Sequence, residues 1–109
     1  MATRIRDTAF IGTELKININ IQPIDNITMD DYEFTVEMYC SPKRTLTIKK
    51  ADAIRADANN YIVCIDTEMI GAGDLKCKVT ANIPDGDFSD MFRTEVVAVD
   101  TGISIIKSL

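Results

Sequence analysis

Apolar and polar side chains alternate strictly over residues 13–21, which read Thr-Glu-Leu-Lys-Ile-Asn-Ile-Asn-Ile. The pattern returns over residues 32–40, 75–83 and 92–100. Successive side chains of a β-strand point to opposite faces of its sheet, so each segment offers one face to a core and one to water. The repeated alternation therefore predicts an antiparallel all-β domain.

The spacing of these segments favours an immunoglobulin-like β-sandwich of about seven strands, which typically takes about 100 residues. The predicted strands cover residues 13–21, 32–41, 44–50, a short edge strand around Ile54, 61–66, 75–83 and 92–100. One helical turn is expected after an N-cap at Asp66 or Thr67, with glycines at its exit. Residues 1–12 lack a clear period and are predicted to form an N-terminal arm, which leaves residues 13–109 for the sandwich. A five-stranded oligonucleotide-binding barrel ranks second.

Length and charge narrow the function classes. The 109 residues suffice for one domain. A net charge of −5 argues against nucleic acid as a partner, because that affinity needs clustered Lys and Arg. The sequence has no apolar run long enough for a membrane span, and its N-terminus has no apolar run typical of a secretion signal. We therefore expect no membrane partner, and folding in a cytoplasm.

The cysteines and the missing histidines weigh against a reactive centre. The chain has three cysteines, Cys40, Cys64 and Cys77, and no histidine. On an immunoglobulin-like topology Cys40 and Cys77 lie near opposite ends of the sandwich, too far apart for a disulfide. Zinc ligation and Ser-His-Asp or Cys-His catalysis lack their histidine. We predict buried, reduced thiols, no catalytic residues, no cofactor and no metal.

One acidic turn offers an alternative reading. Asp85, Asp87 and Asp90 lie in the turn Pro-Asp-Gly-Asp-Phe-Ser-Asp, and three carboxylates in one loop can begin a calcium shell. Their spacing does not match an EF-hand loop, and Asp is a routine turn former. A solvated turn is the preferred interpretation, with an ion site as the alternative.

Both ends of the chain supply candidate partner contacts. Residues 96–99 read Val-Val-Ala-Val and are apolar on both faces, which indicates either packed layers or a partner. The tail that follows either extends the last strand or forms a contact of its own. The predicted contact residues are Arg4, Arg6, Val97, Val99, Ile103, Ile105 and Ile106.

Four segments carry a resemblance to a known family. They are residues 13–19 (Thr-Glu-Leu-Lys-Ile-Asn-Ile), 60–66 (Asn-Tyr-Ile-Val-Cys-Ile-Asp), 71–75 (Gly-Ala-Gly-Asp-Leu) and 83–90 (Ile-Pro-Asp-Gly-Asp-Phe-Ser-Asp). Over residues 14–105 the chain resembles small immunoglobulin-like virion proteins of tailed phages that infect Bacteroidales, including crAss-like phages. It is also similar to the N-terminal domain of phage upper-baseplate proteins.

The resemblance implies a non-enzymatic structural role in a virion assembled in the host cytoplasm. An auxiliary capsid protein, which decorates the head shell and binds the major capsid protein, is the preferred expectation, because upper-baseplate domains are normally followed by further fibre-building segments. The alternatives are a tail, baseplate or fibre-attachment adaptor, a homo-oligomer, and a carbohydrate-binding surface module. The last would use exposed aromatics, for which Phe10, Tyr39, Phe88 and Phe92 are the candidates.

Overall fold

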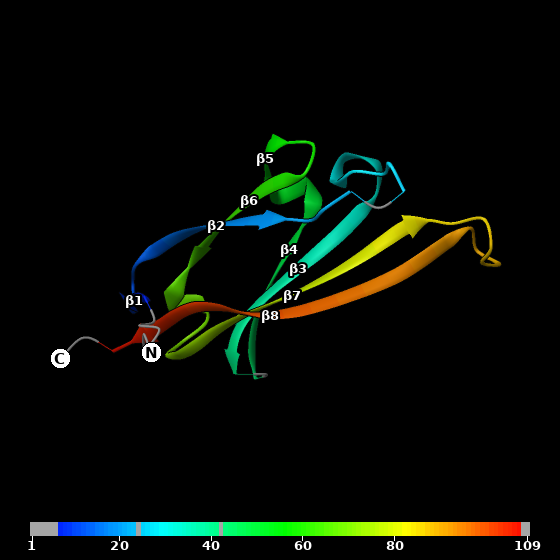
Figure 1. The fold of residues 1–109 in the computed structure, drawn as a ribbon. Coiled ribbons are helices and arrows are strands. Elements are labelled where there is room, and N and C mark those ends of the chain that lie inside the picture. The colour runs from blue at the N-terminus through cyan, green and yellow to red at the C-terminus, as the bar shows by residue number, and fades with distance from the viewer. Residues whose placement is uncertain (1–6, 24, 42, 108–109) are drawn as a thin grey trace, which may run out of the picture.

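The computed structural model describes residues 7–23, 25–41 and 43–107 (Figure 1). Over these ranges the chain forms eight strands: β1 (Asp7–Phe10), β2 (Glu14–Asn20), β3 (Glu33–Ser41), β4 (Arg44–Lys49), β5 (Ile54–Asp57), β6 (Asn60–Asp66), β7 (Gly73–Pro84) and β8 (Phe92–Ile106). Three single 3₁₀ turns connect them: η1 (Met29–Asp31), η2 (Lys50–Asp52) and η3 (Thr67–Met69).

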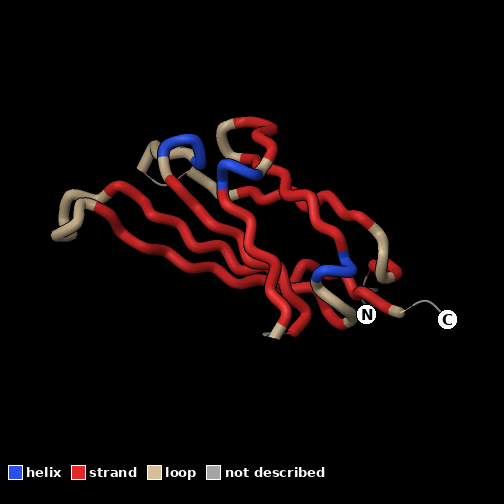
Figure 2. Tube along the Cα trace, turned by 180° about the vertical axis from the view of Figure 1, so that it is seen from behind, coloured by secondary structure: helices blue, strands red, loops and turns tan. Residues whose placement is uncertain are grey.

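The strands form two sheets that pack face to face (Figures 1 and 2). The larger sheet has the order β1-β8-β7-β3-β4 and the smaller the order β2-β6-β5. Every pair is antiparallel except β1 and β8, which run parallel. The predicted all-β, immunoglobulin-like sandwich is thus confirmed, with one strand and two 3₁₀ turns more than expected.

Alternation along the strands builds the core. Phe34, Val36 and Met38 on β3 point inward from the larger sheet, and Val63 and Ile65 on β6 face them from the smaller one. All five side chains are buried, while their sequence neighbours are more exposed. The fold therefore follows from the period-2 pattern read in the sequence.

The weakly patterned connections also form as predicted. The edge strand around Ile54 is β5, which pairs only with β6. The expected helical turn is η3, where the Asp66 carboxylate accepts a hydrogen bond of 3.0 Å from the Glu68 amide. A side-chain oxygen at this position satisfies an amide that the turn itself leaves without a partner.

A strand forms within the segment that was predicted as an N-terminal arm, residues 1–12. Residues 7–10 form β1, which pairs with Ile103–Ile106 at the end of β8. The methyl group of Ala9 is buried. The following loop is fixed by Thr67, which is fully buried. Its hydroxyl accepts from the Gly12 amide and donates to the Thr13 carbonyl, both at 2.9 Å.

The C-terminal tail extends the last strand. β8 continues past the expected end at residue 100 to Ile106. Ile105 is only 1% exposed and lies between its register partners Ala9 on β1 and Gly73 on β7. Of the two alternatives for the tail, strand extension is the one that the fold adopts.

The three cysteines are free and differ in burial. Cys77 is buried on the inner face of β7, Cys40 is half-buried, and Cys64 is exposed. The prediction of three buried thiols is therefore wrong for Cys64. Its neighbours Val63 and Ile65 take the inner face of β6, so alternation turns Cys64 outward.

Candidate functional site

Two strand edges meet at one open side of the sandwich. Among the described residues β2 pairs only with β6, and β1 covers only the Ile103–Ile106 end of β8. Over residues 92–99, β8 thus has a pairing neighbour on one side alone within that part of the chain. Exposed strand edges offer unpaired amides and carbonyls to another strand.

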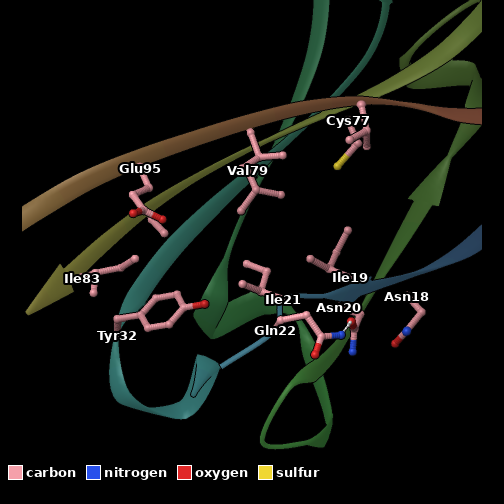
Figure 3. A pocket seen from close by; sticks show the side chains of 13 residues that line it. Asn18, Ile19, Asn20, Ile21, Gln22, Tyr32, Cys77, Val79, Ile83 and Glu95 are labelled. Atoms are coloured by element: carbon pink, nitrogen blue, oxygen red, sulfur yellow. Dashed lines mark hydrogen bonds between the residues drawn. The ribbon is translucent and has the colours of Figure 1, made fainter. Parts of the chain in front are cut away.

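An apolar groove runs between these two edges, and we call it the edge groove (Figure 3). It has a volume of about 450 Å³. Its walls come from β2 and the residues after it, from Tyr32, and from β7 and β8: Asn18, Ile19, Asn20, Ile21, Gln22, Tyr32, Cys77, Val79, Ala81, Ile83, Glu95, Val97 and Val99.

The two valines of β8 are the exposed part of this groove. Val97 and Val99 pair with Val79 and Cys77 of β7, both of which are buried on the inner face. The valines share that face, yet they remain 58% and 53% exposed. The smaller sheet ends at β2 and leaves them uncovered, because it has three strands against five.

The amides along β2 are engaged within the fold. Asn18 and Asn20 each donate to the Asn60 side-chain oxygen, at 3.0 and 2.9 Å. Gln22 donates to Asn20 at 3.1 Å (Figure 3). Asn60 in turn donates to Asp57. This amide ladder fixes β2 to β6 and leaves recognition in the groove to apolar packing and strand pairing.

Two titratable groups of the groove, Cys77 and Tyr32, are shifted toward their neutral forms. Burial raises the pKa of the Cys77 thiol to about 11, so the thiol is protonated at neutral pH and packs as an apolar group. Burial, and secondarily the charge of Glu95, raises the pKa of Tyr32. Neither side chain adds a charge to the apolar walls of the groove at neutral pH.

A second candidate surface lies at the end of the β7–β8 hairpin. Phe88, Met91 and Phe92 form what we call the hairpin tip, and they are 48%, 60% and 48% exposed. The hairpin reaches beyond the other loops at that end of the molecule (Figure 1). Exposed apolar side chains gathered at one place mark a contact surface more often than scattered ones do.

The acidic residues of the same turn hold its shape. Asp85 accepts from Arg93 and from the Asp87 amide, and Asp90 accepts from the Phe92 amide. The Asp87 amide, followed by Arg93, lowers the pKa of Asp85. Over the described ranges no group of three or more His, Cys, Asp or Glu side chains is placed to hold a metal ion.

A third polar cluster ties η1 to the smaller sheet. Arg55 binds the Asp30 carboxylate through Nε at 2.9 Å and Nη2 at 2.8 Å, and the Tyr61 hydroxyl donates to the same carboxylate. Lys50 donates to the main-chain carbonyls of Asp30 and Tyr32 at 3.1 and 2.8 Å. Each donor has a partner inside the fold, so this cluster is structural.

The predicted contact residues fall into separate places. Val97 and Val99 lie in the edge groove. Ile103 is half-buried beside β1, and Ile105 belongs to the core, where no partner can reach its side chain. Ile106 is partly exposed. The predicted contacts at positions 4 and 6 lie outside the described residues.

The sequence analysis named Phe88 and Phe92 as exposed aromatics but missed the surface that they form with Met91. Phe88 and Met91 lie in a turn, where an apolar side chain is not part of a strand face that packs on the core. Large apolar residues at turn positions are the sequence signal for such an exposed surface. Of the candidate sugar-binding aromatics, only Phe88 and Phe92 share one place, the hairpin tip. Phe10 lies on β1, at the opposite end of the molecule from the hairpin that carries Phe88 and Phe92 (Figure 1).

Comparison with known protein families, curated proteins and solved structures finds no match for this chain. No helical segment within the described ranges is long and apolar enough to span a membrane. The class of protein is therefore defined by the fold alone, as a small immunoglobulin-like β-sandwich with an open edge groove and an apolar hairpin tip.

Proposed function

We propose that this chain is a non-enzymatic structural protein of a tailed-phage virion, an auxiliary protein that decorates the head shell. The sequence resemblance supports the virion setting, and the sandwich supports a rigid contact module. The observation that carries the proposal is the hairpin tip, where Phe88, Met91 and Phe92 stand exposed at one end of the molecule.

The tip is held rigidly by its own turn. The Asp85 amide donates to the Met91 carbonyl and the Met91 amide to the Phe88 carbonyl, both at 2.9 Å. Arg93 joins Asp85 to Glu95 at the base of the turn. Because the apolar side chains are positioned in advance, docking costs less conformational entropy than ordering a mobile loop would.

The charge around the tip suggests the chemistry of the partner surface. Asp87 and Asp90 flank Phe88 and are exposed, and the chain carries a net charge of −5. A complementary surface on the shell has an apolar pocket with a basic rim. One such contact is small, but a lattice that binds many copies of one small module offers this contact at every repeat.

The binding test compares two double variants. Phe88→Ser with Met91→Asn removes the apolar tip, and Asn tolerates the positive φ of 67° at position 91. Phe10→Ser with Met69→Ser removes two equally exposed apolar side chains elsewhere. We expect the tip variant to lose at least about tenfold in copies bound to undecorated heads in co-sedimentation, as for an interface centre, while the control binds as the unmodified chain does.

Electron microscopy of the parent virion tests the location. Density for the chain on the head shell is expected. Density on the tail alone would favour the baseplate or fibre-attachment adaptor, and its absence from the particle would overturn the virion role altogether. Equal binding by the two double variants would overturn the role of the hairpin tip.

A further inference from the structure

The ladder between β7 and β8 fixes which backbone groups of β8 point away from the sheet. Among the described residues, β8 pairs with β7 alone from residue 92 to residue 99 and borders the larger sheet there (Figure 1). The Asp85 amide donates to the Met91 carbonyl, and Pro84, which has no amide, is the register partner of Phe92. Hydrogen-bonded and non-hydrogen-bonded pairs alternate along an antiparallel ladder. The even-numbered residues of β8 therefore direct their amides and carbonyls toward the free edge.

These outward groups are available to a second strand. Within the described ranges, no strand lies beside Thr94 or Val96 on that side. The Phe92 amide is held by the Asp90 carboxylate at 3.1 Å, but its carbonyl still points outward. An edge with exposed amides and carbonyls is a template for pairing with another chain.

The side chains of this edge match those of a second copy of the same edge. A two-fold axis at Thr94 pairs two β8 strands antiparallel and sets the two Thr94 side chains opposite each other. Phe92 then lies opposite the partner's Val96, and Arg93 opposite the partner's Glu95. Aromatic with β-branched, Thr with Thr, and opposite charges are the cross-strand pairs that stabilise an antiparallel sheet.

The neighbouring registers lack this complementarity. Residues directly opposite each other share one face of a continuous sheet, so the axis must pass through a residue. An axis at Glu95 sets two carboxylates against each other, which is destabilising. An axis at Val96 sets Arg93 and Glu95 opposite valines of the partner and leaves both charges without a charged partner across the pair.

The axis at Thr94 also brings exposed apolar side chains together. Phe92 and Val96, which are both exposed, meet on the outer face. On the inner face, Met91 of one copy comes level with Val97 of the partner copy, and each of these side chains is exposed in the single chain. Removal of this apolar surface from water favours association.

We propose that two copies of this chain associate through antiparallel pairing of residues 92–96 of β8 about Thr94, which joins the two larger sheets into one. Five paired residues in each copy make a small interface, so the dimer dissociates on dilution. Phe88 of the hairpin tip lies outside the paired segment. The inference does not rest on the head-shell role, because the dimer forms with no capsid present.

Proline substitutions test the pairing and its register. Thr94→Pro removes an outward amide at the axis, and an edge strand tolerates proline where its N–H faces solvent. Ala98→Pro is the matched control, because its amide faces the same edge but lies outside the paired segment. Sedimentation velocity over a dilution series should show a monomer–dimer equilibrium for the unmodified chain and the control. Association of Thr94→Pro should be at least about tenfold weaker.

Disulfide trapping gives a second readout, which also serves if Thr94→Pro fails to fold. In a Cys64→Ser background, which removes the exposed native thiol, Thr94→Cys places two thiols across the axis. The Cα atoms of a hydrogen-bonded antiparallel pair lie about 5.5 Å apart, within reach of a disulfide. Ala98→Cys is the control, and its cross-linking between copies should be at least about tenfold slower.

Four results would overturn the proposal. They are an unmodified chain that stays monomeric throughout the dilution series, unchanged association of a folded Thr94→Pro variant, association weakened as much by Ala98→Pro, and equal rates of cross-linking from the two cysteine positions. The last two would place any contact between copies elsewhere on the strand.

Discussion

Arg55 donates two hydrogen bonds to the carboxylate of Asp30, from Nε at 2.9 Å and from Nη2 at 2.8 Å. This pair links the edge strand β5 to the turn η1, which leads into β3. The contact crosses from the smaller sheet to the entry of the larger one. A bidentate guanidinium–carboxylate pair fixes orientation as well as distance. Ordering at this end of the sandwich therefore depends on the ionised form of one side chain.

The first prediction concerns pH. Hydrogen bonds from Arg55, and then from Tyr61, lower the pKa of Asp30 to about 2. A carboxylate whose folded-state pKa lies below its unfolded value stabilises the fold above the unfolded pKa, and this contribution is lost as pH falls from about 4 to 2. Asp30→Asn should show a smaller loss of stability over that range than the unmodified chain does.

Urea midpoints measured at pH 7 and at pH 3 check this prediction. Asp52→Asn is the matched control, because Asp52 is exposed in η2 and has no hydrogen bond or ion pair among the contacts described here. The urea midpoint of the control should fall between pH 7 and pH 3 by as much as that of the unmodified chain. If Asp30→Asn does so too, the pair does not govern acid stability.

Thr67 carries the second prediction. Its buried hydroxyl satisfies the Gly12 amide and the Thr13 carbonyl. Thr67→Val keeps the shape but removes the acceptor of the Gly12 amide, at a cost of about 0.5–1.5 kcal/mol for the lost hydrogen bond, while the Thr13 carbonyl keeps the Thr67 amide as a donor. Thr67→Ser keeps the hydroxyl and should cost less. Chemical denaturation of both variants measures the difference, and equal losses would mean that the methyl group is what matters.

The third prediction separates two neighbouring residues of the C-terminal tail. Ile105→Ala removes a buried side chain of the core and should cost about 2–5 kcal/mol of unfolding free energy. Ile106→Ala alters a partly exposed side chain and should cost much less. Thermal or urea unfolding of the two variants tests whether the tail belongs to the core, and similar small effects would show that it does not.

The cysteines provide a fourth prediction. Burial raises the pKa of Cys77 from 9.0 to about 11, which lowers its thiolate fraction about a hundredfold at pH 8. Cys64 is exposed and should be alkylated first, while Cys77 should stay unmodified until the chain unfolds. Peptide mapping after timed iodoacetamide treatment gives the order. Early modification of Cys77 would contradict its position on the inner face.

Much of the fold could be predicted from alternation, because β7 buries one complete face and β3 buries most of one. On β2 the same alternation buries Ile19 and half-buries Leu15 and Ile17. β1 could not be predicted in this way, because Ala9 is the one buried residue of that strand and the partner of β1, β8, is the last strand of the described chain. The edge groove could not be predicted from the sequence for another reason. The apolar character of Val97 and Val99 is visible in the sequence, but their exposure depends on how far the smaller sheet extends.

The parallel pairing of β1 with the end of β8 has a mechanical consequence. Tension applied through the two ends of the chain pulls Asp7 and Ile106 in opposite directions along neighbouring strands. The backbone hydrogen bonds between β1 and β8 then bear the load together in shear, instead of opening one after another as in a peeled hairpin. The short β1–β8 pair is thus the contact that resists extension of the domain by its two ends.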